Sequence, residues 1–358
     1  MTPAEAARYD RQMRLPEVGP AGQERLAAAS VLVIGAGGLG SPVALYLAAA
    51  GVGHIGIVDF DRVDASNLHR QILYATDDVG GRKTEAAAAR LRALNPHVTV
   101  ETHDLKLDAR NARRLIARYD LVADGADTFA TRYAVNDACV ATGRPNVFAS
   151  VSAFQGQASV FGAPGGPCYR CLFPEPPPEG TVPSCAEGGV LGVLPGLMGT
   201  IQATEVLKWV LGVGGSLAGR LLTVDALTME MRSLRVSRDE DCSYCNNGPV
   251  RSYPVPMTIP EIGPSDAARL LADEPGATSL LDVRSEDEHA ADHLGGTLLP
   301  LNQLPWRLDE IELLRERRVL VHCRTGSRSA QAVAYLRERG FNAVNVRGGI
   351  EAWRREVT

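Results

Sequence analysis

The stretch that decides the fold covers residues 31–41 and reads Val-Leu-Val-Ile-Gly-Ala-Gly-Gly-Leu-Gly-Ser. An apolar run enters a glycine cluster, and an Ala/Leu-rich stretch over 42–50 follows it. This order predicts a buried strand, a tight turn and a helix. Gly35, Gly37 and Gly40 fill the positions of a G-x-G-x-x-G turn, which brings backbone amides and a helix N-terminus to a phosphate group. The stretch therefore predicts a nucleotide site, for which a dinucleotide is the usual ligand.

Strands and helices alternate through the first half of the chain, as the hydrophobic periodicity indicates. The expected strands cover 31–35, 54–58, 99–103, 121–123 and 146–151, and the expected helices cover 3–29, 42–50, 83–94, 109–117 and 132–142. This alternation predicts an α/β fold with a doubly wound, largely parallel Rossmann-like sheet. Farther on, 156–161 and 221–225 are expected to be strands without regular helix partners, and 192–210 is expected to contain a buried helix.

A proline-rich stretch then divides the chain. It covers 249–260 and holds four prolines, so we interpret it as an extended linker between a first domain over 1–248 and a second over 261–358. In the second domain, expected strands at 280–283, 318–322 and 343–346 accompany expected helices at 265–272 and 329–339. This part is predicted to be a smaller α/β domain.

Composition narrows the classes of function. The 358 residues carry a formal net charge of -5 and no basic block, which argues against nucleic acid as the main partner. The N-terminus lacks the basic start and the apolar core of a signal peptide. The longest apolar stretch, 43–60, is interrupted by three glycines and a histidine, which fits a helix, turn and strand better than a membrane span. A soluble cytoplasmic protein is expected.

Four of the seven cysteines form two Cys-x-x-Cys pairs, Cys168 with Cys171 and Cys242 with Cys245. In a long chain of this type such pairs point to metal or redox chemistry rather than to disulfides. Four thiolates in two pairs suit a closed, tetrahedral and therefore structural Zn²⁺ site that joins two distant segments. The alternative is two independent pairs that are redox-active or merely buried.

Charged and polar side chains gather where predicted strands end, at the edge of an open α/β sheet that forms the ligand crevice. They are Asp59, Asp61, Asn67, Arg70, Lys83 and Asp127. Asp59 is placed to hold a ribose hydroxyl, Arg70 and Lys83 suit a triphosphate, and the Asp127 carboxylate suits Mg²⁺. A hydride-transferring enzyme needs no such set of cations. Taken singly, each residue could equally be a solvated loop charge.

Several motifs in a fixed order make the first domain recognisable. They are Arg8-Tyr-Asp-Arg-Gln12, Gly35-Ala-Gly-Gly-Leu-Gly40, Asp59-Phe-Asp61, Ser66-Asn-Leu-His-Arg-Gln71, Lys83 and the two cysteine pairs. The stretch from Ala6 to Gly248 thereby resembles the MoeB/ThiF family of ubiquitin-activating-like adenylyltransferases. The resemblance implies a homodimer that uses ATP and Mg²⁺ rather than a nicotinamide cofactor. It implies that the C-terminal Gly-Gly carboxylate of a ubiquitin-like sulfur-carrier protein becomes an acyl-adenylate, with release of pyrophosphate.

The same resemblance implies roles for individual residues. ATP would be bound by the glycine turn, including Gly38, and by Asp59, Asp61, Asn67, Arg70 and Lys83, with Mg²⁺ held by Asp127. Arg11 would reach into the active site of the neighbouring subunit. His69 and Thr128 depart from the common glutamine and asparagine, and Thr128 puts one secondary nucleotide contact in doubt. Cys185 matches a loop cysteine that links to the carrier in some members, and a bystander thiol is the alternative.

The second domain carries a compact motif of its own. An apolar run over 318–322 delivers Cys323-Arg-Thr-Gly-Ser-Arg328, and an expected helix follows at once. Backbone amides curled around a cysteine at a helix N-terminus favour its thiolate form. With Leu281-Asp-Val-Arg284 and His293-Leu-Gly-Gly296 upstream, this part resembles a rhodanese domain. The resemblance implies that Cys323 carries a persulfide and that Arg328 closes the loop. The alternative is an inactive rhodanese fold kept for docking.

Together the two motif sets predict one reaction sequence. ATP activates the carrier's carboxylate, a Cys323 persulfide taken from thiosulfate or a cysteine desulfurase attacks the acyl group, and reductive release, with Cys185 as the candidate thiol, leaves a thiocarboxylate. Two other classes of protein are also compatible with parts of the sequence. The glycine turn and Asp59 alone would also suit a nicotinamide-dependent oxidoreductase, and a non-catalytic scaffold could dock a ubiquitin-like partner. The sequence does not name the carrier or the pathway, whether molybdopterin synthesis, thiamine synthesis, cysteine synthesis or tRNA thiolation.

Overall fold

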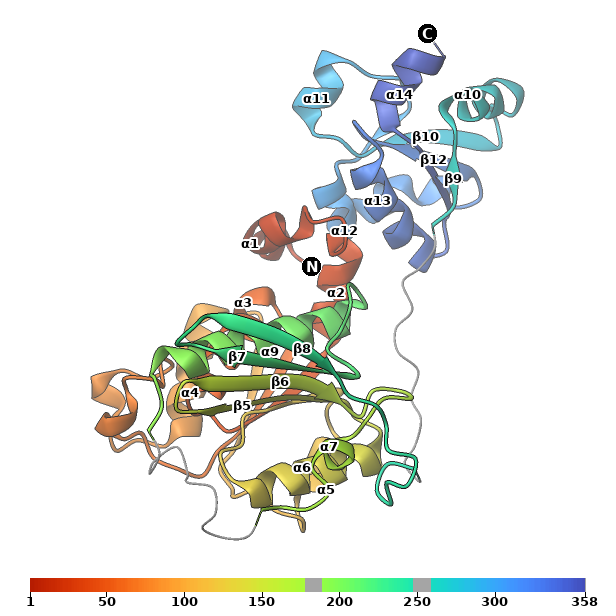
Figure 1. Ribbon diagram of the computed structural model, residues 1–358. Coiled ribbons are helices and arrows are strands. Elements are labelled where there is room, and N and C mark those ends of the chain that lie inside the picture. The colour runs from red at the N-terminus through yellow and green to blue at the C-terminus, as the bar shows by residue number, and fades with distance from the viewer. Residues whose placement is uncertain (178–188, 247–258, 358) are drawn as a thin grey trace. The chain divides into compact units, whose positions relative to one another are not determined.

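The computed structural model describes residues 1–177, 189–246 and 259–357, which fall into two compact units (Figure 1). One unit is formed by Leu26–Pro254, and the other by Met1–Arg25 together with Val255–Thr358. The first 25 residues therefore pack with the C-terminal part of the chain, although the expected first domain begins at residue 1. Most of the expected linker, 249–258, lies outside the described residues.

The unit formed by Leu26–Pro254 is built on an eight-stranded sheet in the order β3-β2-β1-β4-β5-β6-β7-β8. The strands are β1 (Ser30–Ile34), β2 (His54–Val58), β3 (Thr99–His103), β4 (Leu121–Asp124), β5 (Asn146–Ser152), β6 (Gln155–Phe161), β7 (Arg220–Asp225) and β8 (Glu230–Arg235). The first five are parallel, and the last three continue the sheet antiparallel. The predicted largely parallel sheet is confirmed, and the strand β8 was not predicted.

Helices cover both faces of this sheet (Figure 1). On one face lie α3 (Gly40–Ala50), α4 (Lys83–Leu94) and α9 (Val193–Leu211), and on the other lie α5 (Ala112–Ile116), α6 (Phe129–Thr142) and α7 (Tyr169–Leu172). Because both faces are covered, the central strand β1 is apolar at every position from Val31 to Ile34 instead of alternating. Helix α4 has the predicted bounds, and α5 is shorter than the predicted 109–117.

The other unit holds a five-stranded parallel sheet in the order β11-β10-β12-β13-β9. Its strands are β9 (Glu261–Ile262), β10 (Thr278–Asp282), β11 (Thr297–Leu298), β12 (Arg318–His322) and β13 (Asn342–Val346). Its helices are α1 (Pro3–Met13), α10 (Pro264–Asp273), α11 (Glu286–Ala291), α12 (Leu304–Arg307), α13 (Ser327–Glu338) and α14 (Gly349–Glu356). Helix α2 (Gly19–Ala28) begins in this unit and ends in the other. The predicted smaller α/β domain is confirmed.

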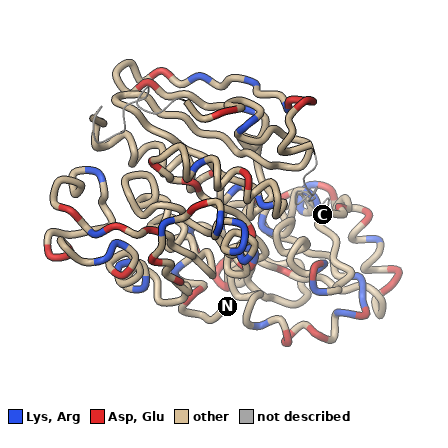
Figure 2. Tube along the Cα trace, turned by 90° about the horizontal axis from the view of Figure 1, so that it is seen from below, with Lys and Arg blue, Asp and Glu red and all other residues tan. Residues whose placement is uncertain are grey.

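Charged residues of both signs are interspersed along the described chain (Figure 2), in line with the modest net charge. None of the helices that the structure describes is both long enough and apolar enough to cross a bilayer.

Candidate active sites

The turn after β1 is held in a conformation that only glycine fits. Gly35 has a φ of +81° and its amide donates to the Val58 carbonyl at 2.8 Å. A Cβ on Gly40 would lie 1.8 Å from the Gly35 carbonyl oxygen, and one on Gly38 would lie 2.9 Å from Pro195. Since L side chains rarely adopt a positive φ or tolerate such distances, these positions require glycine. The turn thus leads directly into the N-terminus of α3.

Asp59, at the end of β2, stabilises this turn. Its Oδ2 accepts a hydrogen bond from the Ala36 amide at 2.8 Å, and its Oδ1 accepts one from the Asp61 amide at 2.8 Å. Burial raises the pKa of the Asp59 carboxyl, although Lys83 and the two amides favour its charged form. Both carboxylate oxygens therefore bind backbone amides of the protein, and Asp59 also lines the cavity described below.

Lys83 supplies a nearly buried positive charge beside Asp59. It stands at the start of α4 with only 4% of its surface exposed. Its Nζ lies 2.8 Å from Asp61 Oδ2 and 4.0 Å from Asp59 Oδ2. A lysine is buried in this way only when its charge is paired. Of its two partners, Asp61 is exposed, so an anionic ligand can take over part of its role.

Arg70 is positioned by its own turn. A short 3-10 helix, Ala65–Asn67, precedes it, and Arg70 Nη2 donates to the side-chain oxygen of Asn67. Its Nη1 lies 3.3 Å from Nε2 of His69. The predicted pair Asn67 and Arg70 therefore comes together, with Asn67 orienting the guanidinium rather than lining the cavity itself.

One cavity of about 970 Å³ collects most of the predicted nucleotide residues. Its lining includes Gly35, Gly37, Gly38, Asp59, Asp61, Arg70, Lys83, Asp127 and Thr128. The volume is that of an ordinary small-molecule or cofactor site. Asp127 is exposed, whereas the Thr128 hydroxyl caps α6 by accepting from the Thr131 amide at 3.3 Å. Gly40 is not among the residues that line the cavity, and it packs against the Gly35 carbonyl.

The other side of this cavity was not predicted from the sequence. It consists of Arg132, Ser150, Gln155 and Gln157 with the aromatic rings of Phe129, Tyr133, Phe148, Tyr169 and Phe173. Arg132 stacks over Phe148 with its guanidinium carbon 5.1 Å from the ring centroid, and its Nη2 donates to the Ala126 carbonyl. These residues come from four separated segments, so no local pattern in the sequence marks them. Arg11 is exposed on α1 in the other unit, and Cys185 lies outside the described residues.

The four paired cysteines come together. The ligand atoms of Cys168, Cys171, Cys242 and Cys245 all lie within 4.8 Å of one another, with Cys168 and Cys242 buried. The Cys168–Cys242 sulfurs are 3.8 Å apart and the Cys171–Cys245 sulfurs 3.5 Å apart. Four sulfurs at Zn–S bonds of about 2.3 Å in a tetrahedron would be about 3.8 Å apart. The thiols therefore fit a structural zinc ion, and the prediction that the two pairs meet is confirmed.

In the smaller unit, Cys323 follows β12 and is fully buried. The Gly326 amide donates to its sulfur at 3.2 Å and the Ser329 hydroxyl at 3.5 Å. Gly326 adopts a φ of +97° and directly precedes α13. One amide and one hydroxyl therefore contact the sulfur at the N-terminus of a helix, and the predicted cradle of several amides stays a prediction.

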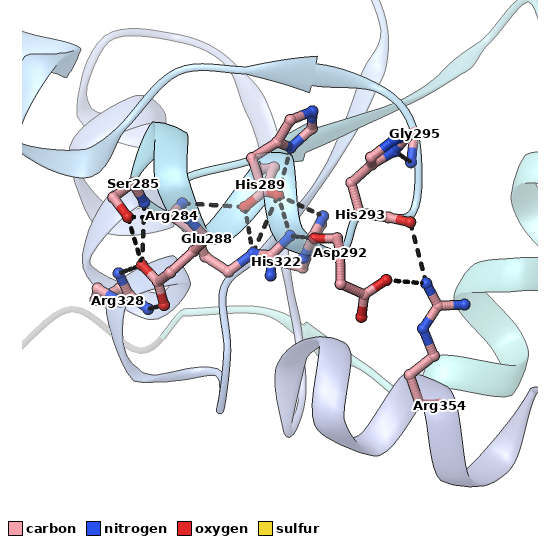
Figure 3. A network of polar contacts seen from close by, with 11 residues as sticks. Arg284, Ser285, Glu288, His289, Asp292, His293, Gly295, His322, Arg328 and Arg354 are labelled. Atoms are coloured by element: carbon pink, nitrogen blue, oxygen red, sulfur yellow. Dashed lines mark hydrogen bonds and ion pairs between the residues drawn. The ribbon is translucent and has the colours of Figure 1, made fainter.

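Arg328 and Glu288 close one side of this loop (Figure 3). Both terminal nitrogens of Arg328 bind the Glu288 carboxylate at 2.7 Å, and this pairing holds the pKa of Glu288 at about 2. Ser285 adds a capping interaction, since its amide donates to Glu288 Oε2 at 3.1 Å. Sequence reasoning identified Arg328 but missed Glu288.

A second polar cluster contains Arg284, His289 and His322, which are labelled in Figure 3. Asp282 at the end of β10 is fully buried and binds Arg284 and His289, the latter at 2.9 Å. Burial disfavours the charged form of Asp282, but the hydrogen bonds from Arg284 and His289 outweigh it and hold its pKa at about 2. His322, next to Cys323, is also fully buried, and burial lowers its pKa. The cluster joins β10, β12 and α11, and its residue His322 directly precedes Cys323.

Comparison with known families covers both units. The chain matches the ThiF family over residues 9–244 and the rhodanese-like domain over residues 264–356. A sulfur carrier protein adenylyltransferase of Thermus thermophilus is 55% identical over 255 residues, which are 70% of this chain and 94% of that protein.

Two relatives match along nearly the whole chain. The probable adenylyltransferase/sulfurtransferase MoeZ of Mycobacterium tuberculosis is 43% identical, over 99% of this chain and 94% of its own length. The adenylyltransferase and sulfurtransferase MOCS3 of Bos taurus is 42% identical, over 99% of this chain and 86% of its own length. Among solved structures, MccB of E. coli with ATP aligns with a TM-score of 0.60 at 23% identity, over 67% of this chain and 75% of that chain, which shows a shared fold.

Proposed function

Because the chain belongs to the ThiF family and carries a rhodanese-like domain, we propose that it adenylylates a ubiquitin-like sulfur-carrier protein and then transfers sulfur to it. The observation that carries this proposal is the joint lining of one cavity by the glycine turn, Arg70, Lys83 and Asp127. Three cationic side chains, Arg70, Lys83 and Arg132, line this cavity and suit a triphosphate, which the nicotinamide alternative does not require. The named relatives, an adenylyltransferase of sulfur carriers and two adenylyltransferase/sulfurtransferases, support the same reading.

In the first step, a carboxylate oxygen of the carrier's C-terminal glycine attacks the α-phosphorus of ATP. The bond from that phosphorus to the β-phosphate oxygen breaks, and pyrophosphate leaves with the electron pair. Both reactants are anions, so Arg70 and Lys83 lower their repulsion and stabilise the charge that develops at the phosphate. Amides of the turn around Gly37 and Gly38 contact the phosphates at the start of α3, and Asp59 holds the ribose.

Two metal ions are part of the proposal. Asp127 is an exposed cavity carboxylate with no protein partner in the described parts of the chain, so it fits Mg²⁺, a hard cation that prefers such oxygens. When bound, Mg²⁺ neutralises phosphate charge. Cys168, Cys171, Cys242 and Cys245 would hold Zn²⁺, which serves structure because four thiolates leave no open position. By family resemblance, Arg11 acts on the neighbouring subunit of a homodimer.

In the second step, the outer sulfur of a Cys323 persulfide attacks the acyl carbon and AMP leaves. This gives an acyl disulfide between the carrier and Cys323. A second thiol, for which Cys185 is the candidate, then attacks the Cys323 sulfur. The thiocarboxylate is released, the two cysteines become a disulfide, and a cellular thiol reductant restores them. Amides of the loop and Arg328 stabilise the negative charge of the persulfide. The sulfur donor would be thiosulfate or a desulfurase persulfide.

Pyrophosphate exchange tests the first step. The purified chain is mixed with ATP, labelled pyrophosphate and a carrier that ends in Gly-Gly, with the same carrier lacking its last glycine as control. Exchange is expected only with the intact carrier, because the attacking carboxylate must reach the α-phosphate. Equal exchange with both carriers, or the same exchange when no carrier is added, would contradict the assignment. Mass measurement of the carrier after thiosulfate and a thiol reductant are added then detects the thiocarboxylate.

A further inference from the structure

We propose that the N-terminal segment, Met1–Arg25, is part of the sulfur-transfer domain: it packs on that domain and walls the cavity at Arg328, so that it limits by size what reaches Cys323. The family match places residues 9–25 with the adenylylating part of the chain, and no role in sulfur transfer follows from that match. The inference rests on contacts inside the unit that the segment forms with Val255–Thr358.

The middle of α2 is bound to α13, the helix that follows the Cys323 loop. Glu24 accepts a hydrogen bond from the Tyr335 hydroxyl at 2.9 Å and forms an ion pair with Arg339. Arg25 pairs with Glu338 at 3.3 Å. Tyr335 is 1% exposed, so its hydroxyl needs a hydrogen-bond partner within the protein, and the half-buried Glu24 is that partner.

Apolar contacts extend the same interface. Ala21 is buried within the core cluster that contains Leu301, Leu304 and Leu336. Gly19 adopts a φ of +55°, and a Cβ there would lie 3.1 Å from the Gln331 side chain of α13. The segment thus completes the core of the smaller unit instead of lying loosely on its surface.

Helix α1 is held by a separate contact. Ala6, Tyr9 and Met13 form one buried face, and Trp306 of α12 packs against it. These residues lie three or four positions apart, which places them on one side of the helix. An isolated helix of eleven residues is marginal in water, so α1 depends on this packing for its stability.

The docked segment forms one side of a cavity of about 560 Å³. Asp10, Met13, Arg14 and Pro20 line that side. Arg328 and Glu288 line the other, and Arg328 also interacts with the Cys323 thiol. The cavity therefore reaches the ion pair that closes the cysteine loop, whereas the buried Cys323 itself does not line it. Without α1 it would be open on the Met13 side.

Access to Cys323 should then depend on the size of the reacting molecule. A small donor or alkylating agent fits the cavity with α1 in place, whereas a bulky one requires α1 to move. Release of α1 adds space without altering the loop around the sulfur. The segment thus filters by size, which a purely stabilising segment would not do.

The experiment compares Met13→Ala with Leu15→Ala in the full chain. Both remove a large apolar side chain, but Met13 is 3% exposed and Leu15 is 53% exposed. Cys323 is modified with iodoacetamide or with a maleimide carrying a long polyethylene glycol chain, and mass spectrometry of the Cys323 peptide gives each rate. We expect Met13→Ala to raise the maleimide rate by about tenfold and the iodoacetamide rate by less than about twofold, because a local opening exposes the site to large reagents. Leu15→Ala should change neither rate.

A milder variant guards against loss of folding. Tyr335→Phe removes only the hydroxyl that binds Glu24, and we expect it to raise the maleimide rate by about threefold; Tyr46→Phe, on the exposed surface of the other unit, is its control. An unchanged maleimide rate in both Met13→Ala and Tyr335→Phe would overturn the proposal, as would an equal rise with both reagents. The test needs neither ATP nor a carrier, so its failure is distinguishable from failure of the proposed function.

Discussion

Both terminal nitrogens of Arg328 bind the Glu288 carboxylate at 2.7 Å. The last residue of the cysteine loop is thus held by helix α11, which precedes in sequence the strand β12 that leads into the loop. A bidentate pair of this kind fixes the plane of the guanidinium as well as its position. The orientation of Arg328 toward the Cys323 sulfur therefore depends on α11.

Replacement of Glu288 should impair sulfur transfer more than stability. We expect Glu288→Gln to lower kcat for thiosulfate sulfur transfer by about tenfold, because Arg328 then loses its fixed orientation. Glu288→Asp keeps the charge and should recover part of the loss. Steady-state kinetics separate kcat from KM, and Glu286→Gln on the same helix is the control. A normal kcat in Glu288→Gln would contradict the positioning role.

Cys323→Ala should separate the two activities. The sulfur is the atom that would carry the persulfide, so sulfur transfer from thiosulfate is expected to fall to background. Pyrophosphate exchange with a Gly-Gly carrier should stay near that of the unmodified chain, because Cys323 lies in the other compact unit. Sulfur transfer that persists in the variant would show that another cysteine carries the sulfur.

Removal of the buried ammonium of Lys83 should weaken adenylylation strongly. We expect Lys83→Met to reduce pyrophosphate exchange by about 100-fold or more, since loss of one preorganised charge at a reacting phosphate costs about 3 kcal/mol. Thiosulfate sulfur transfer should be unaffected. Arg113→Met removes an exposed cation from α5 and serves as control. Equal exchange rates in the two variants would remove Lys83 from the site.

The buried Asp282 should make the smaller unit sensitive to acid. Its pKa of about 2 lies below the ordinary value of an unfolded Asp, near 4, so its charge stabilises the fold above about pH 4. That contribution, about 2 to 3 kcal/mol, is lost as the pH falls from about 4 to about 2. Urea unfolding between pH 5 and pH 3 should show a smaller pH dependence in Asp282→Asn than in the unmodified chain. Identical pH dependence would contradict this account.

The features that the sequence predicted are those whose cause is local. The glycine turn is one example: the carbonyl of Gly35 lies where a side chain on Gly40 would be, and this steric demand is visible as spacing alone. The two cysteine pairs are another, because the Cys-x-x-Cys spacing of each pair is local and is typical of a metal ligand set. Helix α4, from Lys83 to Leu94, is rich in residues that favour helices, such as alanine and leucine, and both of its ends were predicted.

The features that were missed depend on contacts between distant residues. Glu288 has a role only because Arg328, 40 positions later, returns to it. Strand β8 was missed because all six of its residues are exposed, so it has no alternating pattern. The hydrogen bond from Tyr335 to Glu24 joins residues 311 positions apart. The sequence around neither residue contains a pattern that predicts this contact.

The four cysteines also support the wall of the nucleotide cavity. Tyr169 stands between Cys168 and Cys171, and its amide donates to the Asn136 side chain at 2.8 Å. Two residues past Cys171, the Phe173 carbonyl accepts from the Tyr133 hydroxyl at 2.9 Å. Tyr133, Tyr169 and Phe173 all line the cavity. A metal ion bound by the four thiols would therefore hold this aromatic wall in place.

Loss of that metal should consequently weaken nucleotide binding as well as folding. We expect the unmodified chain to bind about one zinc ion and Cys242→Ser to lose it, because a hydroxyl is a poor replacement for a thiolate ligand. The variant should also unfold at a lower temperature and show a higher KM for ATP in pyrophosphate exchange. Cys139→Ala, at a buried position in α6, is the control: it should lose stability through a cavity but keep its zinc. Elemental analysis measures the metal, and zinc retained by Cys242→Ser would show that the thiols do not form one site.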